Sequence, residues 1–358
     1  FKVIALAAAL EDRVIDTATI VDTRLGSKAF YGRMITDTKG HGKISAAKAL
    51  EVSSNIGLAS LIDDAYESNP EQFLNFLEQW GLDTPLGLPI TGEGLPEIPR
   101  PGDDKWSKNA LPSMAYGYNL RLTPLQILTF YNAIANDGVM VKPQFVERIV
   151  SNNKEIARFP SEVINPKILS DQNLGALRTI LRNIVLRGTG KSLSSEYFSM
   201  AGKTGTARTE YWMADWSENR RYISSFAGYF PADQPKYSCI VVIHKPSTKK
   251  GYYGADVTGP VFKRIAQKIY TDSPLRDTIV LGPEMTPQLA DQVSSPSLIH
   301  EEASGIPDVT GWPAMDALAV LENLGLKVML KGEGKVVDQS LTKGSPIVQG
   351  DLIIITLS

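Results

Sequence analysis

The sequence predicts a mixed α/β chain of the α+β type, with one large domain and a small βα module after it. Three observations favour this class. Helical patterns fill much of the first half, and strand-like runs follow at 199–208, 222–229 and 237–244. A polar, proline-rich stretch then separates them from a last segment with its own helix and strands. The 358 residues suffice for about two domains.

Composition narrows the function classes. Hydrophobic residues make up 43% and charged residues 21% of the chain, as is ordinary for a globular protein. The net charge of −2, without a basic stripe, argues against nucleic acid as a partner. No apolar run approaches the roughly 18 residues of a transmembrane helix. The single cysteine, Cys239, excludes an internal disulfide and fits a buried, inert thiol.

The chain begins with an apolar segment from Phe1 to Leu10 that Lys2 alone interrupts. A signal-peptide core is one interpretation, but charged residues follow where small residues should precede a cleavage site. We therefore expect a buried helix over 1–13 whose upstream part has been cut away, so that the chain is a fragment. Gly- and Thr-rich residues 14–44 indicate turns and short strands.

The central elements have clear boundary signals. Helical spacing covers 45–64 with an interruption at 53–55, and Pro70 opens a second helix that ends near Trp80. Many prolines and glycines predict a long loop over 84–113. Later helices are expected at 123–136, 170–187 and 260–270, where capping residues precede or Gly follows the apolar pattern.

The end of the chain predicts a separate module. Residues 272–305 contain four prolines and no periodicity, which indicates a linker, assigned to 273–304. A helix and three strands, at 326–330, 336–339 and 352–357, follow it. The expected organisation is thus a domain over 1–272, the linker, and a module over 305–358, whose core is small for independent stability.

The strongest chemical signal is Lys203-Thr204-Gly205-Thr206, inside a predicted strand. Lys-Thr-Gly is one of three signature elements of penicillin-binding proteins and serine β-lactamases, beside Ser-x-x-Lys and Ser-x-Asn. A strand that lines a cleft would offer a cation, hydroxyls and a glycine that lets a ligand approach, which suits a carboxylate. An exposed turn is the alternative interpretation.

The Ser-x-Asn pattern occurs four times, so setting must select among its copies. Ser53–Asn55 interrupts a helical stretch and lies well before Lys203, which favours it. A helix cap by Ser53 or Ser54 is an alternative that can coexist with this role.

The Ser-x-x-Lys pattern also occurs four times, beginning at Ser45, Ser151, Ser247 and Ser340. Ser45–Lys48 begins a helix but stands too close to Ser53 to form an opposite wall, and the others fall in turns or the tail. All four are judged coincidental. Phe1-Lys2, at the start of an apolar helix, instead has the form expected of the end of this motif.

Several longer phrases extend the pattern over most of the chain: 49–57, 115–126, 188–191, 252–262 and 307–358. Together with the motifs, they resemble the transpeptidase portion of a division-type class B penicillin-binding protein with a C-terminal PASTA domain. Asn119 departs from a commoner Gly or Gln. The resemblance implies the penicillin-binding-protein/serine β-lactamase fold, an antiparallel sheet flanked by helices.

The resemblance also implies residue roles. The nucleophilic serine would lie three residues before Lys2, outside this chain, so the fragment should not be acylated. Lys2 would accept its proton, with a pKa lowered by desolvation and by Lys203. Ser53 would relay a proton to the leaving group, and Asn55 would orient Lys2 and hold the substrate amide.

On the strand, Thr204, Gly205 and Thr206 would bind the substrate, with both hydroxyls on its terminal carboxylate. The Thr206 N–H would share the oxyanion hole with that of the serine. The resemblance implies no cofactor and no metal, and the three histidines, His41, His244 and His300, are scattered. A loop over 211–216 with two tryptophans is a hypothesised border of the groove.

The implied reaction is serine-type D,D-transpeptidation, which cross-links peptidoglycan stem peptides ending in D-Ala-D-Ala and is inhibited by β-lactams. The implied partners are divisome or elongasome membrane proteins. The implied location is the bacterial cell envelope, at the extracytoplasmic face of the cytoplasmic membrane. Two alternatives stay open: a non-catalytic peptidoglycan-binding or scaffold protein, and a β-lactam sensor or serine β-lactamase.

Overall fold

The computed structural model describes residues 1–152, 154–210, 213, 215, 219–248, 251–272, 305–332 and 334–358. It divides into two compact units, Phe1–Leu275 and Arg276–Ser358. The predicted linker over 273–304 lies outside the described residues, as do Trp212 and Trp216 of the hypothesised aromatic border.

Helix α1 (Lys2–Glu11) runs through the centre of the helical part of the first unit. Residues Val3 to Ala9 have no exposed surface, because the helix is apolar on every side and must be covered all round. This confirms the predicted burial. The helices packed around it are α2 (Ala46–Glu51), α3 (Asn55–Tyr66), α4 (Pro70–Gln79), α5 (Ala110–Ala115) and α7 (Asp171–Arg187).

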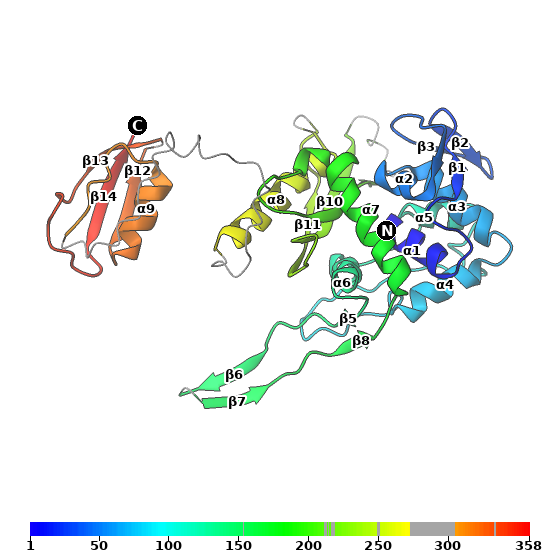
Figure 1. The fold of residues 1–358 in the computed structure, drawn as a ribbon, viewed down its shortest axis with the longest axis horizontal. Helices are drawn as coiled ribbons and strands as arrows, with labels where there is room; N and C mark the ends of the chain where they lie inside the picture. Colours follow the sequence, from blue (N-terminus) through cyan, green and yellow to red (C-terminus); the bar gives the residue numbers. More distant parts are fainter. Residues whose placement is uncertain are drawn as a thin grey trace, which may run out of the picture. The chain divides into compact units, whose positions relative to one another are not determined.

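The three predicted strands form one antiparallel sheet in the order β11-β10-β9. They are β9 (Ala201–Thr209), β10 (Arg221–Phe230) and β11 (Tyr237–His244). Phe226 and Phe230 pack with Phe262 of α8 (Gly254–Asp272), whereas Ala227 and Tyr229 join the helical core that includes α6 (Pro124–Ala135). Helices therefore cover both faces of the sheet (Figure 1).

Two predicted boundaries were wrong. Helix α8 begins at Gly254 instead of Pro260, which lies inside the helix. The turn before the proline is held in place because Thr258 Oγ1 donates to the Gly254 carbonyl and Gly254 packs on β9. Helix α5 occupies the end of the predicted 84–113 loop, since tertiary burial overrides the proline at position 112.

Short strands precede α2 and α3. β1 (Ile20–Asp22) pairs with β4 (Lys43–Ser45), and β2 (Ser27–Phe30) forms a hairpin with β3 (Arg33–Thr36). The hairpin places Phe30 and Ile35 against Ile56 and Ala59 of α3. This packing brings the residue after β3, Asp37, to the first turn of that helix.

A two-stranded ribbon projects from the body of this unit (Figure 1). Its base is the pair β5 (Met140–Val141) and β8 (Val163–Asn165), and its arm is the pair β6 (Arg148–Ser151) and β7 (Lys154–Arg158). Every residue of β6 is exposed. Since the strand buries neither face, its sequence has no alternation of apolar and polar residues from which it could be predicted.

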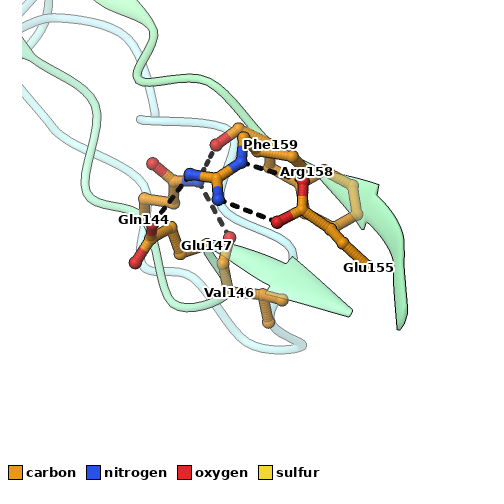
Figure 2. A network of polar contacts seen from close by, with 6 residues as sticks. All are labelled: Gln144, Val146, Glu147, Glu155, Arg158 and Phe159. Atoms are coloured by element: carbon orange, nitrogen blue, oxygen red, sulfur yellow. Dashed lines mark hydrogen bonds and ion pairs between the residues drawn. The ribbon is translucent and has the colours of Figure 1, made fainter. Parts of the chain in front are cut away.

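Polar contacts hold the arm where it leaves the base (Figure 2). The Arg158 guanidinium donates to both Glu155 carboxylate oxygens and to Glu147 Oε1, 3.1 Å away. The Gln144 amide nitrogen donates to the Val146 and Phe159 carbonyls. These bonds substitute for the core that a two-stranded ribbon lacks.

The second unit is the predicted small βα module. Helix α9 (Ala314–Asn323) precedes β12 (Lys327–Lys331), β13 (Val336–Gln339) and β14 (Leu352–Leu357). The central strand β14 pairs parallel with β12 and antiparallel with β13. Leu321, Ile353 and Ile355 are fully buried, so the module has a core of its own.

Candidate functional site

Three segments that are distant in the sequence meet in one place: the start of α1, the turn between α2 and α3, and β9. The Lys2 ammonium donates to the Ser53 carbonyl at 2.9 Å and to Ser53 Oγ at 3.0 Å. Lys203, only 6% exposed, donates from Nζ to the Thr204 carbonyl at 2.9 Å. Ser53 has a φ of +59°, a left-handed conformation that is strained for a residue with a side chain.

Burial controls the charges of this site. It lowers the pKa of Lys2 to about 8, while the negative charge of Asp37 opposes the fall. Burial, together with repulsion by Lys2, holds the pKa of Lys203 well below its usual range. Lys2 can therefore be partly neutral near pH 8, as a proton acceptor must be.

The three residues of the motif Ser53-Ser54-Asn55 make different contacts. Ser54 is the N-cap of α3: its Oγ accepts from the Gly57 N–H at 2.8 Å. The Asn55 side-chain amide donates to the Thr36 carbonyl at 2.9 Å and so is directed toward β3. Of the three residues, Ser53 is the one that accepts hydrogen bonds from Lys2, so the helix cap and the contact with Lys2 lie on neighbouring residues.

β9 lies at the end of the strand order β11-β10-β9, so no further strand of the described residues pairs with its outer side. The Arg208 N–H donates to Tyr118 Oη, and the Thr204 carbonyl accepts from Lys203. Backbone groups alternate along an antiparallel edge, so the Thr206 N–H points outward with them. Such an edge can pair with an extended ligand.

Two hydroxyls on β9 have defined contacts. Thr204 Oγ1 lies 2.8 Å from Thr189 Oγ1, and Thr206 Oγ1 accepts from the Gly254 N–H at 3.0 Å. Gly205 serves helix–strand packing. A Cβ there would lie 2.4 Å from Ser225 Oγ, and one at Gly254 would lie 2.7 Å from the Gly205 carbonyl oxygen. The Ser225 hydroxyl can rotate away from a Cβ at Gly205, but the backbone atoms around Gly254 cannot move aside, so the close approach of α8 to β9 requires glycine at position 254.

Sequence reasoning missed three residues of this site. Asp37 follows a short strand and has no motif around it, while Tyr118 reaches Arg208 from another element. Thr189 lies in the 188–191 phrase and Tyr118 in the 115–126 phrase, and these phrases are signals that could have found both residues. Across the described part of the chain, His, Cys, Asp and Glu form no group of three that could hold a metal ion. No helix described there is both long and apolar enough to cross a bilayer.

Comparison with known proteins agrees with this geometry. The family model "Penicillin binding protein transpeptidase domain" matches residues 1–267, and the model "PASTA domain" matches residues 305–358. Penicillin-binding protein PbpB of Mycolicibacterium smegmatis is 28% identical over 82% of this chain and 45% of its own length. Stage V sporulation protein D of Bacillus subtilis is 25% identical over 100% of the chain and 53% of its own length.

Solved structures show the same fold. Penicillin-binding protein 3 of Mycobacterium tuberculosis, with aztreonam, has a TM-score of 0.64 and 28% identity over 79% of this chain and 62% of its own. The ampicillin complex gives 0.64 and 27%, over 80% and 63%. The chain spans about half the length of the curated relatives it matches. With its transpeptidase match over residues 1–267 and a PASTA domain after it, the chain belongs to the penicillin-binding protein transpeptidase family.

Proposed function

We propose that the chain supplies most of the active site of a peptidoglycan D,D-transpeptidase that works through a serine acyl-enzyme. The observation that carries the proposal is the contact between Lys2 and Ser53: a buried amine, with a pKa lowered to about 8, hydrogen-bonded to a hydroxyl. A neutral amine can take a proton from a nucleophile, and the adjacent hydroxyl can pass one to a leaving group.

In the proposed reaction, a serine three residues before Lys2 in a longer protein attacks the carbonyl of the penultimate D-Ala. Its proton passes to Lys2, the C–N bond breaks, and the last D-Ala leaves with a proton relayed by Ser53. An amine from a second stem peptide then displaces the serine.

The substrate is proposed to lie along the outer edge of β9. The outward Thr206 N–H and that of the serine would hold the oxyanion, each worth roughly 3 kcal/mol. The Thr204 and Thr206 hydroxyls and Lys203 would hold the terminal carboxylate. Asn55 would need to turn from Thr36 to reach the substrate amide and Lys2. Related structures with aztreonam and ampicillin support β-lactams as ligands of the same site.

We also propose the wider setting of this activity. The partners would be stem peptides ending in D-Ala-D-Ala and the membrane proteins of the divisome or elongasome, at the extracytoplasmic face of the cytoplasmic membrane. Relatives named peptidoglycan D,D-transpeptidase FtsI support a place in wall synthesis. Residues 1–272 would form the catalytic domain and residues 305–358 a separate PASTA module, joined by 273–304.

Labelling with a fluorescent penicillin tests the proposal. A version extended by upstream residues should become covalently labelled, its Lys2→Arg variant should lose the label, and the 358-residue chain should stay unlabelled. An unlabelled extended protein that melts cooperatively would contradict the proposal and favour a non-catalytic wall-binding role. Labelling of the 358-residue chain would show that the nucleophile has been misplaced.

A further inference from the structure

Asp37, in the segment between β3 and β4, places its carboxylate at the start of α3. Its Oδ2 atom accepts from the Ser54 hydroxyl at 2.5 Å. Its Oδ1 atom accepts from the Asn55 N–H at 2.5 Å and from the Ile56 N–H at 3.3 Å. A carboxylate at this place is favoured by the first-turn N–H groups and the helix dipole.

This contact exceeds what helix capping requires, because Ser54 already caps α3 through the Gly57 N–H. What Asp37 adds is a hold on two consecutive residues, Ser54 and Asn55, directly after the turn. Ser53 immediately precedes them, with its strained φ of +59°. A continuous series of hydrogen bonds and peptide links therefore runs from Asp37 through Ser54 and Ser53 to Lys2.

Charged side chains on two other elements face Lys2. Lys203 faces it from β9 and is cationic when protonated. Asp37 faces it from the β3–β4 segment with the opposite charge and raises its pKa against the effect of burial. Without this carboxylate, Lys2 and Lys203 would share one buried site, and no opposite charge would offset their repulsion among the groups that shift the pKa of Lys2.

We propose that Asp37 is a positioning residue of the transpeptidase site, which locks the turn carrying Ser53 and supplies the negative charge that keeps Lys2 ready to cycle between its protonated and neutral forms. This inference rests on the proposed function. The two effects are separable, since locking the turn affects how fast the site reacts, whereas the charge affects the pH at which it becomes reactive.

The test compares variants of the upstream-extended protein by the pH dependence of penicillin acylation. Asp37→Asn keeps the shape and removes the charge. Its maximal rate should fall, and the midpoint of the rise with pH should move about one unit to the acid side, because Lys2 loses its proton more easily. Ser54→Ala keeps the charge of Asp37 but removes the hydroxyl that contacts Asp37 and caps α3, so it should lower the maximal rate and leave the midpoint in place. Asp37→Glu should restore the midpoint.

A purely structural role for Asp37 would lower the rate in Asp37→Asn without moving the midpoint, and that result would overturn the proposal. Should Asp37→Asn melt below the assay temperature, Asp37→Ser, which keeps an oxygen acceptor, takes its place with the same expected shift.

A second measurement does not depend on the reaction. Lysine labelled with ¹³C at Cε allows the titration of Lys2 to be followed by NMR, with its signal identified by its absence in Lys2→Arg. The pKa of Lys2 should be about 8 in the wild type and lower in Asp37→Asn. An unchanged titration would overturn the charge role of Asp37. If the titration shifts but the wild type is never acylated, the proposed function fails and the electrostatic link stands.

Discussion

The Nζ atom of Lys2 lies 3.0 Å from the Oγ atom of Ser53, 51 positions further along the chain. This bond joins the first turn of α1 to the turn between α2 and α3. Ser53 accepts this bond with its backbone in the left-handed conformation, which is unfavourable for any residue that has a Cβ atom. The site therefore combines a desolvated amine with a strained backbone, and each can be examined by substitution.

Ser53→Ala and Ser53→Gly separate the hydroxyl from the strain. Both should lower acylation of the extended protein by roughly a hundredfold, because both remove the group hydrogen-bonded to Lys2. The glycine variant should be more stable than the alanine variant by about 1 kcal/mol, since glycine adopts positive φ freely. Urea unfolding of both variants provides the comparison. Equal midpoints would show that the turn stores no strain.

Lys2→Met should raise the free energy of unfolding at pH 7 by about 1 kcal/mol, because it removes a buried cation. The pKa of Lys2 is about 8 in the folded chain and ordinarily 10.5. Between these values the unfolded chain holds a proton that the folded chain lacks, so wild-type stability rises with pH. The two pKa values differ by about 2.5, so the wild type should gain roughly 3 kcal/mol relative to the variant between pH 8 and 10.5. The gap should therefore close and then reverse, in chemical unfolding measured across this range. The exposed Lys108→Met is the control, and a gap independent of pH would contradict the prediction.

Thr189→Val tests the hydroxyl pair beside the Lys-Thr-Gly strand. Thr189 Oγ1 lies 2.8 Å from Thr204 Oγ1, so it holds the Thr204 hydroxyl in one orientation. Its loss should lower the acylation rate about five- to tenfold, as one hydrogen bond allows. Thr189→Ser keeps the hydroxyl and should retain the rate. Equal rates in the two variants would remove Thr189 from the site.

Gly254→Ala should destabilise the first unit by about 2 kcal/mol. Its new Cβ would lie 2.5 Å from the Ser225 carbonyl oxygen and 2.7 Å from that of Gly205, and backbone atoms cannot move aside easily. Gly175→Ala, on the exposed side of α7 with nothing within 4 Å, should instead stabilise by about 0.5–1 kcal/mol. Thermal melts of the two variants should shift in opposite directions. A shared direction would contradict the packing of α8 on β9.

Replacement of residues 147–158 by a two-residue turn should leave the melting temperature of the first unit nearly unchanged. The β6–β7 arm packs on itself, and its large apolar side chains, such as Ile149 and Ile156, are exposed. The hairpin β2–β3 provides the contrast: Phe30→Ala removes a ring buried against α3 and should cost about 3 kcal/mol. A large loss of stability on truncation would show that the arm supports the domain.

The elements that were predicted correctly have signals that lie within a few residues of one another in the sequence. Thr123 caps α6 and Pro124 occupies its first turn, and the apolar run from Phe1 predicts the buried α1. The strands β9 to β11 follow from β-forming runs separated by turns. The arm could not be predicted in this way, because nothing covers it and its residues carry no periodicity. The start of α8 depends on the fit of Gly254 against another strand.

The sequence by itself therefore determined the fold class, the order of elements, and Lys2, Ser53 and Lys203 as candidates for one site. Only the tertiary structure decided how they interact. The pKa of Lys2 depends on burial by distant helices and on the charge of Asp37, while the direction of Asn55 depends on the carbonyl of Thr36. Desolvation and electrostatic coupling act through space, and neither leaves a local pattern in the chain.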